Sequence, residues 1–181
     1  MILIGEKIKL RNLKDSDWKS IFENANNRKV SKYTDIPYPF TVPEIKKYVR
    51  KLIKEFKTRK SFHFGVEIKE EKGIVGIFSL ENINYKNKSA ELTFWLSSKY
   101  WGENNIASNA LKIILLSAFK KIKLNRIYAR TLPQNIASIK FLKKNNFVCE
   151  GRLRKMLFEK GKFNDVLVFS ILKEEFKKIK Q

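Results

Sequence analysis

The pattern of apolar and polar positions changes its period several times along the chain. Alternation every second residue predicts extended strands, whereas apolar residues spaced three and four apart predict helices. On this basis we expect strands over residues 8–13, 62–68, 74–80, 90–96, 125–132, 147–158 and 163–172. We expect helices over about 15–24, 41–56, 106–122 and 136–144. The predicted order of elements is therefore β-α-α-β-β-β-α-β-α-β-β.

Polar residues mark where several of these elements begin or end. Thr41 is followed three residues later by Glu44, which is the pattern of a capping box. Lys160 and Gly161 separate the last two strands and predict a closing hairpin. Strands that alternate with helices in the second half favour a mixed α/β fold, with helices on both faces of one sheet. Because no Gly-, Ser- or Pro-rich linker divides the chain, we expect a single domain over residues 1–181.

The formal net charge of +21 leaves two explanations open. It can reflect attraction to anions such as a phosphorylated cofactor, RNA or the ribosome. It can also reflect a genome that favours lysine codons, and the spread of lysines through every helix favours this explanation for most of them. Either way, a surface with this charge repels a polycationic substrate such as a polyamine.

The single cysteine, the single histidine and the lengths of the apolar runs bear on the cellular compartment, on a metal site and on a membrane span. The single cysteine, Cys149, excludes an intrachain disulfide and fits a reducing cytoplasm. Its strand position predicts a buried, small apolar side chain, and we expect the single histidine, His63, to serve packing or to lie at the surface. One histidine and one cysteine do not supply a zinc site, so we expect no metal. No apolar run reaches the roughly 18 residues of a membrane span.

Residues 99–108 carry the clearest functional signal. They follow the strand-like run 92–96 and open the long apolar helix 106–122. The first backbone N–H groups of a helix have no partner within the helix, and the helix dipole favours negative charge there. A strand, a small-residue turn and a helix start in this order therefore predict a phosphate site.

Several segments, taken together and in order, resemble one family across nearly the whole chain. They are residues 5–17, 37–41, 90–102, 135–147, 150–154 and 161–166. The set is similar to the GNAT superfamily of acetyl-CoA-dependent N-acetyltransferases, and more narrowly to the RimJ/RimL branch of ribosomal-protein N-terminal acetyltransferases and their relatives. The resemblance implies a GNAT-like mixed but mostly antiparallel sheet, acetyl-CoA as cosubstrate, and residues 99–108 as its pyrophosphate loop.

The resemblance also implies where the cofactor lies. Pantetheine would lie between the strands 92–96 and 127–131, which separate in this family. Lys99 stands in the family's Gln or Arg position and Gly102 is its first glycine. The second glycine is replaced by Asn104 or Asn105, and the loop is one residue longer. The implied cofactor-binding residues are Phe94, Trp95, Leu96, Lys99, Gly102, Asn104, Asn105, Ile106, Ala107, Ser108 and Asn135.

Asparagine is a reasonable replacement for these glycines. It enters the left-handed backbone region more readily than other non-glycine residues. The same exchange recurs at Asn146, where the family has glycine before Phe147. For Asn135, the alternative to cofactor binding is a cap for the following helix, and the two roles are compatible.

Two residues are candidates for proton transfer. We expect Glu91 to act as the general base because of its position on the strand that leads to the acetyl site; the alternative is an exposed strand residue opposite a lysine. Leu142 occupies the position of the family's usual tyrosine acid. In the RimJ/RimL branch a serine is the suggested substitute, and Ser138 stands there; the alternative is a first-turn serine that satisfies a helix N–H.

The sequence defines the acceptor of the acetyl group less closely than it defines the cofactor site. Tyr33, Tyr38 and Phe40 would line the amine pocket by resemblance, or would anchor the early loops. We expect an acetyl-CoA-dependent N-acetyltransferase, cytoplasmic and monomeric or homodimeric, that modifies a protein N-terminal α-amine, with possible ribosome association, or a small-molecule amine. The alternative is a non-catalytic acyl-CoA-binding, ribosome-binding or RNA-binding protein on the same scaffold.

Overall fold

The computed structural model describes residues 2–5, 7–34, 36–102, 105–159 and 161–178, with 177 and 178 described by their backbone alone. One eight-stranded sheet in the order β1-β2-β3-β4-β5-β6-β8-β7 organises these residues. Its strands are β1 (Ile2–Ile4), β2 (Ile8–Asn12), β3 (Phe62–Ile68), β4 (Gly76–Asn84), β5 (Ser89–Leu96), β6 (Arg126–Thr131), β7 (Val148–Glu159) and β8 (Lys162–Leu172).

The helices fill the connections between these strands. They are α1 (Trp18–Ala25), α2 (Arg28–Ser31), α3 (Val42–Lys57), α4 (Ile106–Leu116), α5 (Ile136–Lys144) and α6 (Lys173–Lys178). Short 3-10 turns cover Asp15–Asp17 and Ser98–Tyr100, and a π-helical turn, Ser117–Lys121, ends α4. Among the described residues, no helix has the length and apolar character needed to cross a membrane.

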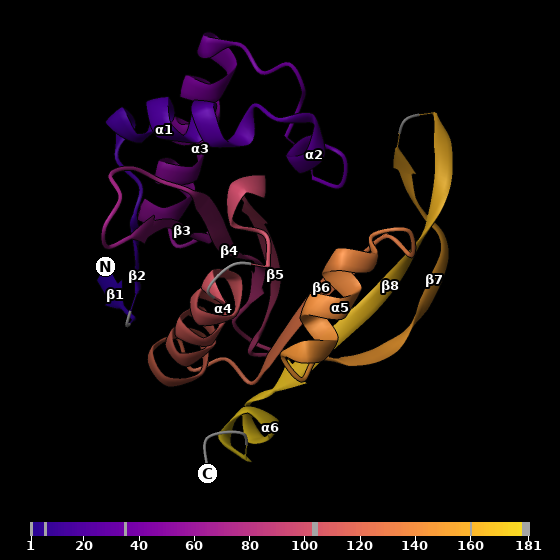
Figure 1. Cartoon of the computed structure of the whole chain (residues 1–181). Coiled ribbons are helices and arrows are strands. Elements are labelled where there is room, and N and C mark those ends of the chain that lie inside the picture. The colour runs from indigo at the N-terminus through magenta and orange to yellow at the C-terminus, as the bar shows by residue number, and fades with distance from the viewer. Residues whose placement is uncertain (1, 6, 35, 103–104, 160, 179–181) are drawn as a thin grey trace.

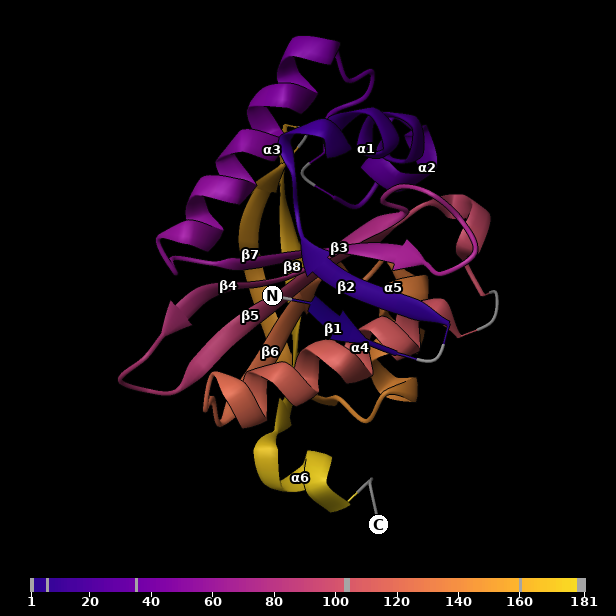
Figure 2. The ribbon, with the colours of Figure 1, turned by 90° about the vertical axis from the view of Figure 1, so that its left-hand side faces the viewer.

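Two apolar clusters hold helices to opposite faces of the sheet. Phe64, Phe78 and Phe169 lie in the larger cluster, which packs α4 and α5 against one face. Ile45 and Ile77 lie in the smaller cluster, which packs α1 and α3 against the other face. Figure 2 shows α1 and α3 on one side of the sheet and α4 on the other. The predicted helix–sheet–helix arrangement is thus confirmed, and burial of these two clusters is its main stabilising contribution.

The sheet is antiparallel except between β5 and β6. These two strands pair in parallel through Ser89–Arg126, Ala90–Ile127 and Glu91–Tyr128. Beyond Glu91 they diverge, as Figure 1 shows. The remaining length of β5 pairs with β4 on one side alone, up to the Gly76–Leu96 pair. The mostly antiparallel sheet expected from the family is confirmed, and its parallel pair opens toward one end.

Local sequence signals explain several element boundaries. The capping box forms at the start of α3, where the backbone N–H and the hydroxyl of Thr41 donate to Glu44 at 2.8 and 2.6 Å. The closing hairpin of β7 and β8 also forms as predicted; Lys160 of its turn lies outside the described residues. The prediction that Cys149 is buried is wrong, because β7 is an edge strand whose side chains are nearly all exposed.

Candidate active site

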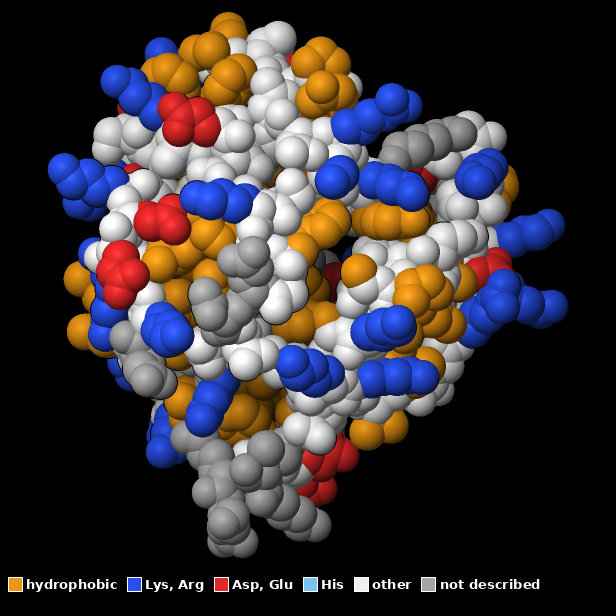
Figure 3. All heavy atoms as spheres, in the orientation of Figure 1, with side chains coloured by type: hydrophobic (Ala, Val, Ile, Leu, Met, Phe, Trp, Pro, Cys, Tyr) orange, Lys and Arg blue, Asp and Glu red, His pale blue; other side chains and the backbone are white. Residues whose placement is uncertain are grey.

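The opening between β5 and β6 leaves one edge of β5 without a neighbouring strand. Backbone N–H and C=O groups along such an edge can bond an extended ligand as they would bond another strand. Figure 3, in the orientation of Figure 1, shows the surface hollowed between α4 and α5 at this opening. Phe94, Trp95 and Leu96, which were predicted to bind the cofactor, lie on this edge.

The side chains of this strand divide between the two faces of the sheet. Phe94 faces α5, with its ring centroid 5.1 Å from that of Phe78 and 4.9 Å from that of Phe141. Trp95 points to the opposite face, into the cluster beneath α1 and α3. The Leu96 carbonyl accepts a hydrogen bond from the Trp101 indole at 2.8 Å. Well-packed side chains on both faces therefore hold the free edge in place.

The loop after β5 is anchored to the turn between β3 and β4. Lys99 Nζ lies 3.5 Å from a Glu71 carboxylate oxygen, and the Tyr100 hydroxyl donates to the same carboxylate. The hydrogen bond to Tyr100 and the charge of Glu71 raise the pKa of Lys99, so this side chain remains cationic at neutral pH. Lys99 thus adds positive charge beside the loop.

Left-handed backbone positions shape the rest of this loop. Gly102 has φ of 80° and Asn105 has φ of 53°. The expectation that an asparagine occupies a left-handed position here is confirmed at Asn105, which directly precedes α4; Asn104 lies outside the described residues. Lys144 Nζ on α5 donates to Asn105 Oδ1 at 3.0 Å and places a further positive charge at the turn.

The first turn of α4 directs its N–H groups toward this loop. The first hydrogen bond of α4 runs from the Asn109 N–H to the Asn105 carbonyl at 2.8 Å. The N–H groups of Ile106, Ala107 and Ser108 come earlier in the helix, where no preceding turn supplies a carbonyl. Together with the dipole of α4 and the adjacent lysines, they form a site that favours an anion.

The start of α5 places two predicted residues beside the opening. Asn135 caps α5, because its Oδ1 accepts from the Ser138 backbone N–H at 3.2 Å. Within the described part of the chain, the Ser138 hydroxyl makes no hydrogen bond. The hydrogen bond from a helix N–H to this hydroxyl, which was the alternative prediction, is therefore not present among the described residues. The capping role predicted for Asn135 is confirmed.

Glu91 is buried rather than exposed, with 4% of its surface accessible. Arg130 donates to its two carboxylate oxygens through Nε and Nη2, at 2.7 and 3.0 Å. Asn82 Nδ2 donates to one of the same oxygens at 2.8 Å. Three donor atoms, two of them on one guanidinium in a two-point contact, therefore hold both oxygens of this carboxylate in place. The role of Glu91 as general base stays a prediction.

The predicted acceptor residues are divided between the surface and the core. The Tyr33 hydroxyl donates to the Gln134 carbonyl at 3.2 Å and so links the segment after α2 to the loop before α5. Tyr38 is exposed. Phe40 is buried in the cluster beneath α1 and α3, where its ring meets Tyr48 edge-on, so it serves as a loop anchor.

A row of polar residues on the same face as Glu91 was not predicted from the sequence. Thr93 lies two positions further along β5, so strand alternation places it beside Glu91. Glu81 of β4 is paired with Glu91 across the strands. Alternation along β5 was a sufficient signal for Thr93. The position of Glu81 depends on the register between β4 and β5, which the sequence alone does not define.

A mixed sheet that opens between its parallel strands beside an anion-favouring helix start is the architecture of acyl-CoA-dependent acetyltransferases. Residues 7–148 match the acetyltransferase (GNAT) domain family. The chain is 30% identical over 175 residues to an uncharacterized N-acetyltransferase p20 of Bacillus licheniformis, covering 96% of this chain and 97% of that protein. It is 26% identical over 174 residues to the spermidine N(1)-acetyltransferase of Vibrio cholerae, covering 96% and 97%.

A solved structure gives the same result. The ribosomal-protein-S5-alanine acetyltransferase from Vibrio fischeri superposes with a TM-score of 0.83 at 26% identity, covering 97% of this chain and 98% of that one. The chain belongs to the GNAT acetyltransferase family. It is an N-acetyltransferase, and the family uses acetyl-CoA as the acetyl donor. Among the described residues, no group of His, Cys, Asp and Glu is arranged to hold a metal ion.

Proposed function

We propose that this N-acetyltransferase transfers acetyl from acetyl-CoA to the N-terminal α-amine of an acidic protein segment in the cytoplasm. The observation that carries the cofactor assignment is the opening between β5 and β6 beside the first turn of α4. The free edge at 94–96 would bond the pantetheine arm. The turn at Gly102 and Asn105, with the N–H groups of residues 106–108, would hold the pyrophosphate.

The chemistry requires no covalent enzyme intermediate. The amine nitrogen attacks the thioester carbonyl, a C–N bond forms and the C–S bond breaks, so CoA leaves as a thiolate. The amine gives up one proton to a base, and the thiolate gains one. Ser138 would donate a hydrogen bond to the sulfur; this role is supported by its hydroxyl, which makes no hydrogen bond among the described residues. Asn135 would contact the cofactor while it caps α5.

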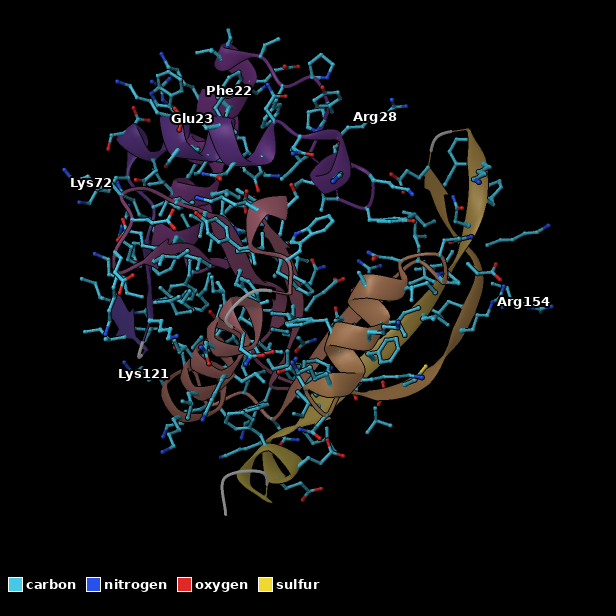
Figure 4. All side chains as sticks on the ribbon, in the orientation of Figure 1. Phe22, Glu23, Arg28, Lys72, Lys121 and Arg154 are labelled. Carbon is cyan, nitrogen blue, oxygen red and sulfur yellow. The ribbon has the colours of Figure 1, made fainter. Side chains whose placement is uncertain are left out.

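The charge around the opening favours an acidic acceptor over a polyamine. Arg28 and Lys29 are exposed on α2, and Arg154 and Lys155 are exposed on the β7–β8 hairpin across from it. Figure 3 shows Lys and Arg side chains around this rim, with few acidic ones between them. In Figure 4, Arg28 projects from α2 on the side of the hairpin, whereas Arg154 points outward. This field attracts acidic residues that follow an N-terminal amine and repels spermidine.

Release of the CoA thiol, measured with three acceptors at equal concentration, tests both parts of the proposal. The acceptors are a peptide with an acidic segment after its free N-terminus, the same peptide with lysines in place of the acidic residues, and spermidine. We expect the acidic peptide to give the highest kcat/KM, by about tenfold or more.

Two results would contradict this proposal. Faster reaction with spermidine than with the acidic peptide would overturn the acceptor. Tight CoA binding without thiol release by any amine would favour the non-catalytic alternative. A version of the acidic peptide with an acetylated N-terminus serves as the control, because it lacks the reactive amine and should release no thiol.

A further inference from the structure

A carboxylate other than Glu91 lies beside the unpaired part of β5. Thr93 is two residues beyond the last pair that β5 makes with β6, and its hydroxyl donates to Glu81 Oε1 at 2.9 Å. This contact places the Glu81 carboxylate over the point where the strands separate. Glu81 and Thr93 lie on the sheet face opposite Phe94, the face that α1 and α3 cover.

The two glutamates differ in how far their oxygens are engaged. The Glu91 side chain is 5% exposed and receives three hydrogen bonds from Arg130 and Asn82. The Glu81 side chain is 36% exposed, and among the described residues it receives one hydrogen bond, at Oε1. A general base needs a lone pair directed at the substrate amine. Glu81 offers Oε2 for this purpose, whereas the oxygens of Glu91 are directed at Arg130.

We propose that Glu81 is the general base that accepts the proton of the attacking amine, an inference that rests on the proposed function. The thioester would reach the opening along β5 from the side of α4, because the anion-favouring turn begins that helix. The amine would approach from the opposite face, where Glu81 and Thr93 lie. As the C–N bond forms, one N–H proton passes to Glu81 Oε2, and the C–S bond breaks to release the CoA thiolate.

Thr93 orients this carboxylate, and His63 lies beside it. His63 is 2% exposed, and its Nδ1 lies 2.8 Å from Ser79 Oγ and 3.8 Å from Glu81 Oε1. Its Nε2 lies 2.9 Å from a Glu55 oxygen and must carry a proton, because a carboxylate only accepts. In the neutral ring, Nδ1 then accepts from Ser79. Oε1 of Glu81 is therefore the oxygen that lies beside Thr93 and His63, and among the described residues Oε2 accepts no hydrogen bond.

The surrounding charges come from three elements. Glu55 and Lys51 of α3 lie behind His63, with Lys51 Nζ 3.9 Å from a Glu55 oxygen. Glu91 of β5 and Arg130 of β6 form the adjacent pair. Arg130 offsets the charge of Glu91. Among the described residues, no Lys or Arg forms an ion pair with Glu81.

The test compares Glu81→Gln with Glu91→Gln and with Glu23→Gln as a matched control. Figure 4 shows Glu23 on α1, on the side away from α5 and the hairpin. The glutamine at position 81 can still accept from Thr93, so we expect an unchanged melting temperature and an unchanged dissociation constant for CoA. We expect kcat at pH 7 to fall about 100-fold or more. High pH should restore part of the rate, because the protonated form of the acceptor amine then loses its extra proton to solvent and becomes nucleophilic without the enzyme's base.

The outcomes separate this inference from the proposed function. If wild-type protein and Glu23→Gln release thiol but Glu81→Gln does so equally fast with the same pH profile, Glu81 is not the base. If Glu91→Gln alone loses the acidic limb of the profile, the base is Glu91. If wild-type protein binds CoA and acetylates no amine, the proposed function itself fails. Thr93→Val offers a second variant, and we expect it to lower kcat while KM for acetyl-CoA stays the same.

Discussion

Asn146 ends α5 in the left-handed backbone region, with φ of 64°. Its N–H donates to the Lys143 carbonyl at 3.0 Å, and the Phe147 N–H donates to the Leu142 carbonyl at 3.0 Å. These two bonds form a Schellman motif, which satisfies the last carbonyls of a helix and favours glycine at the left-handed position. The structure thus gives a physical reason for an asparagine here.

The effect of a substitution at Asn146 on stability should depend on the backbone preference of the new residue and not on lost side-chain contacts, because the side chain is exposed. We expect Asn146→Ala to lower the free energy of unfolding by about 1 kcal/mol, since alanine enters the left-handed region at a higher cost. Asn146→Gly should leave the stability unchanged or slightly raise it. Urea denaturation at neutral pH measures both variants. Equal stability of the alanine and glycine variants would show that the left-handed conformation does not limit this site.

At the scale of elements, a charged cluster joins β2, β3 and the 3-10 turn before α1. Arg11 on β2 donates to Asp17 through Nη1 and Nη2 at 2.7 and 2.8 Å, and to Glu67 on β3 through Nε at 2.7 Å. Lys9 Nζ adds a contact to Glu67 at 2.7 Å. The cluster is largely removed from solvent, so loss of one partner would leave an unmatched charge.

This cluster should make the free energy of unfolding depend on pH in the acidic range. Burial raises the pKa of Glu67, but the hydrogen bonds and charges of Arg11 and Lys9 outweigh it, so the pKa lies below its ordinary value of 4.5. Its stabilising contribution is complete above that value and is lost as the pH falls through the lower folded-state pKa. We expect Glu67→Gln to cost about 2 kcal/mol at pH 7. It should also flatten the fall in unfolding free energy between about pH 5 and pH 3. Parallel curves for variant and wild type would contradict this.

The elements that sequence analysis placed well are those with strong local signals. The strand 62–68 and the helix 136–144 match β3 and α5 at both ends, because alternation defines the first and Asn135 caps the second. Three elements were not predicted: β1, α2 and α6, of three, four and six residues. Segments this short carry too few positions to show a period, and contacts with the rest of the fold define them.

The candidate site was predictable only in part, for a similar reason. The resemblance to the family led to the loop at Gly102 and Asn105, and both residues have the left-handed backbone conformation that was expected for a glycine or asparagine there. The contacts of Glu91 could not be predicted, because Arg130 lies 39 residues away in the sequence. Such a pairing depends on which strands become neighbours. The row formed by Glu81 and Thr93 likewise depends on the register of β4 and β5.

At the scale of the whole molecule, the net charge of +21 should affect the rate at which acceptors are captured. A charged field steers an oppositely charged ligand toward the site, and salt screens that field over about 10 Å at 0.1 M and about 3 Å at 1 M. A positive surface can result from lysine-rich codon usage or from selection for electrostatic steering. Only steering makes the capture of an acidic acceptor more sensitive to salt than that of a neutral one.

We therefore expect kcat/KM for an acidic N-terminal peptide to fall about tenfold between 0.1 and 1 M salt, at saturating acetyl-CoA. A neutral peptide of the same length should lose about twofold or less. Saturation with acetyl-CoA matters because binding of its charged phosphates would add a salt dependence of its own. Replacing Arg28 and Lys29 on α2 by glutamine should reduce the difference between the two peptides. Equal salt dependence of both peptides would mean that the positive charge has no part in acceptor selection and that codon bias alone explains it.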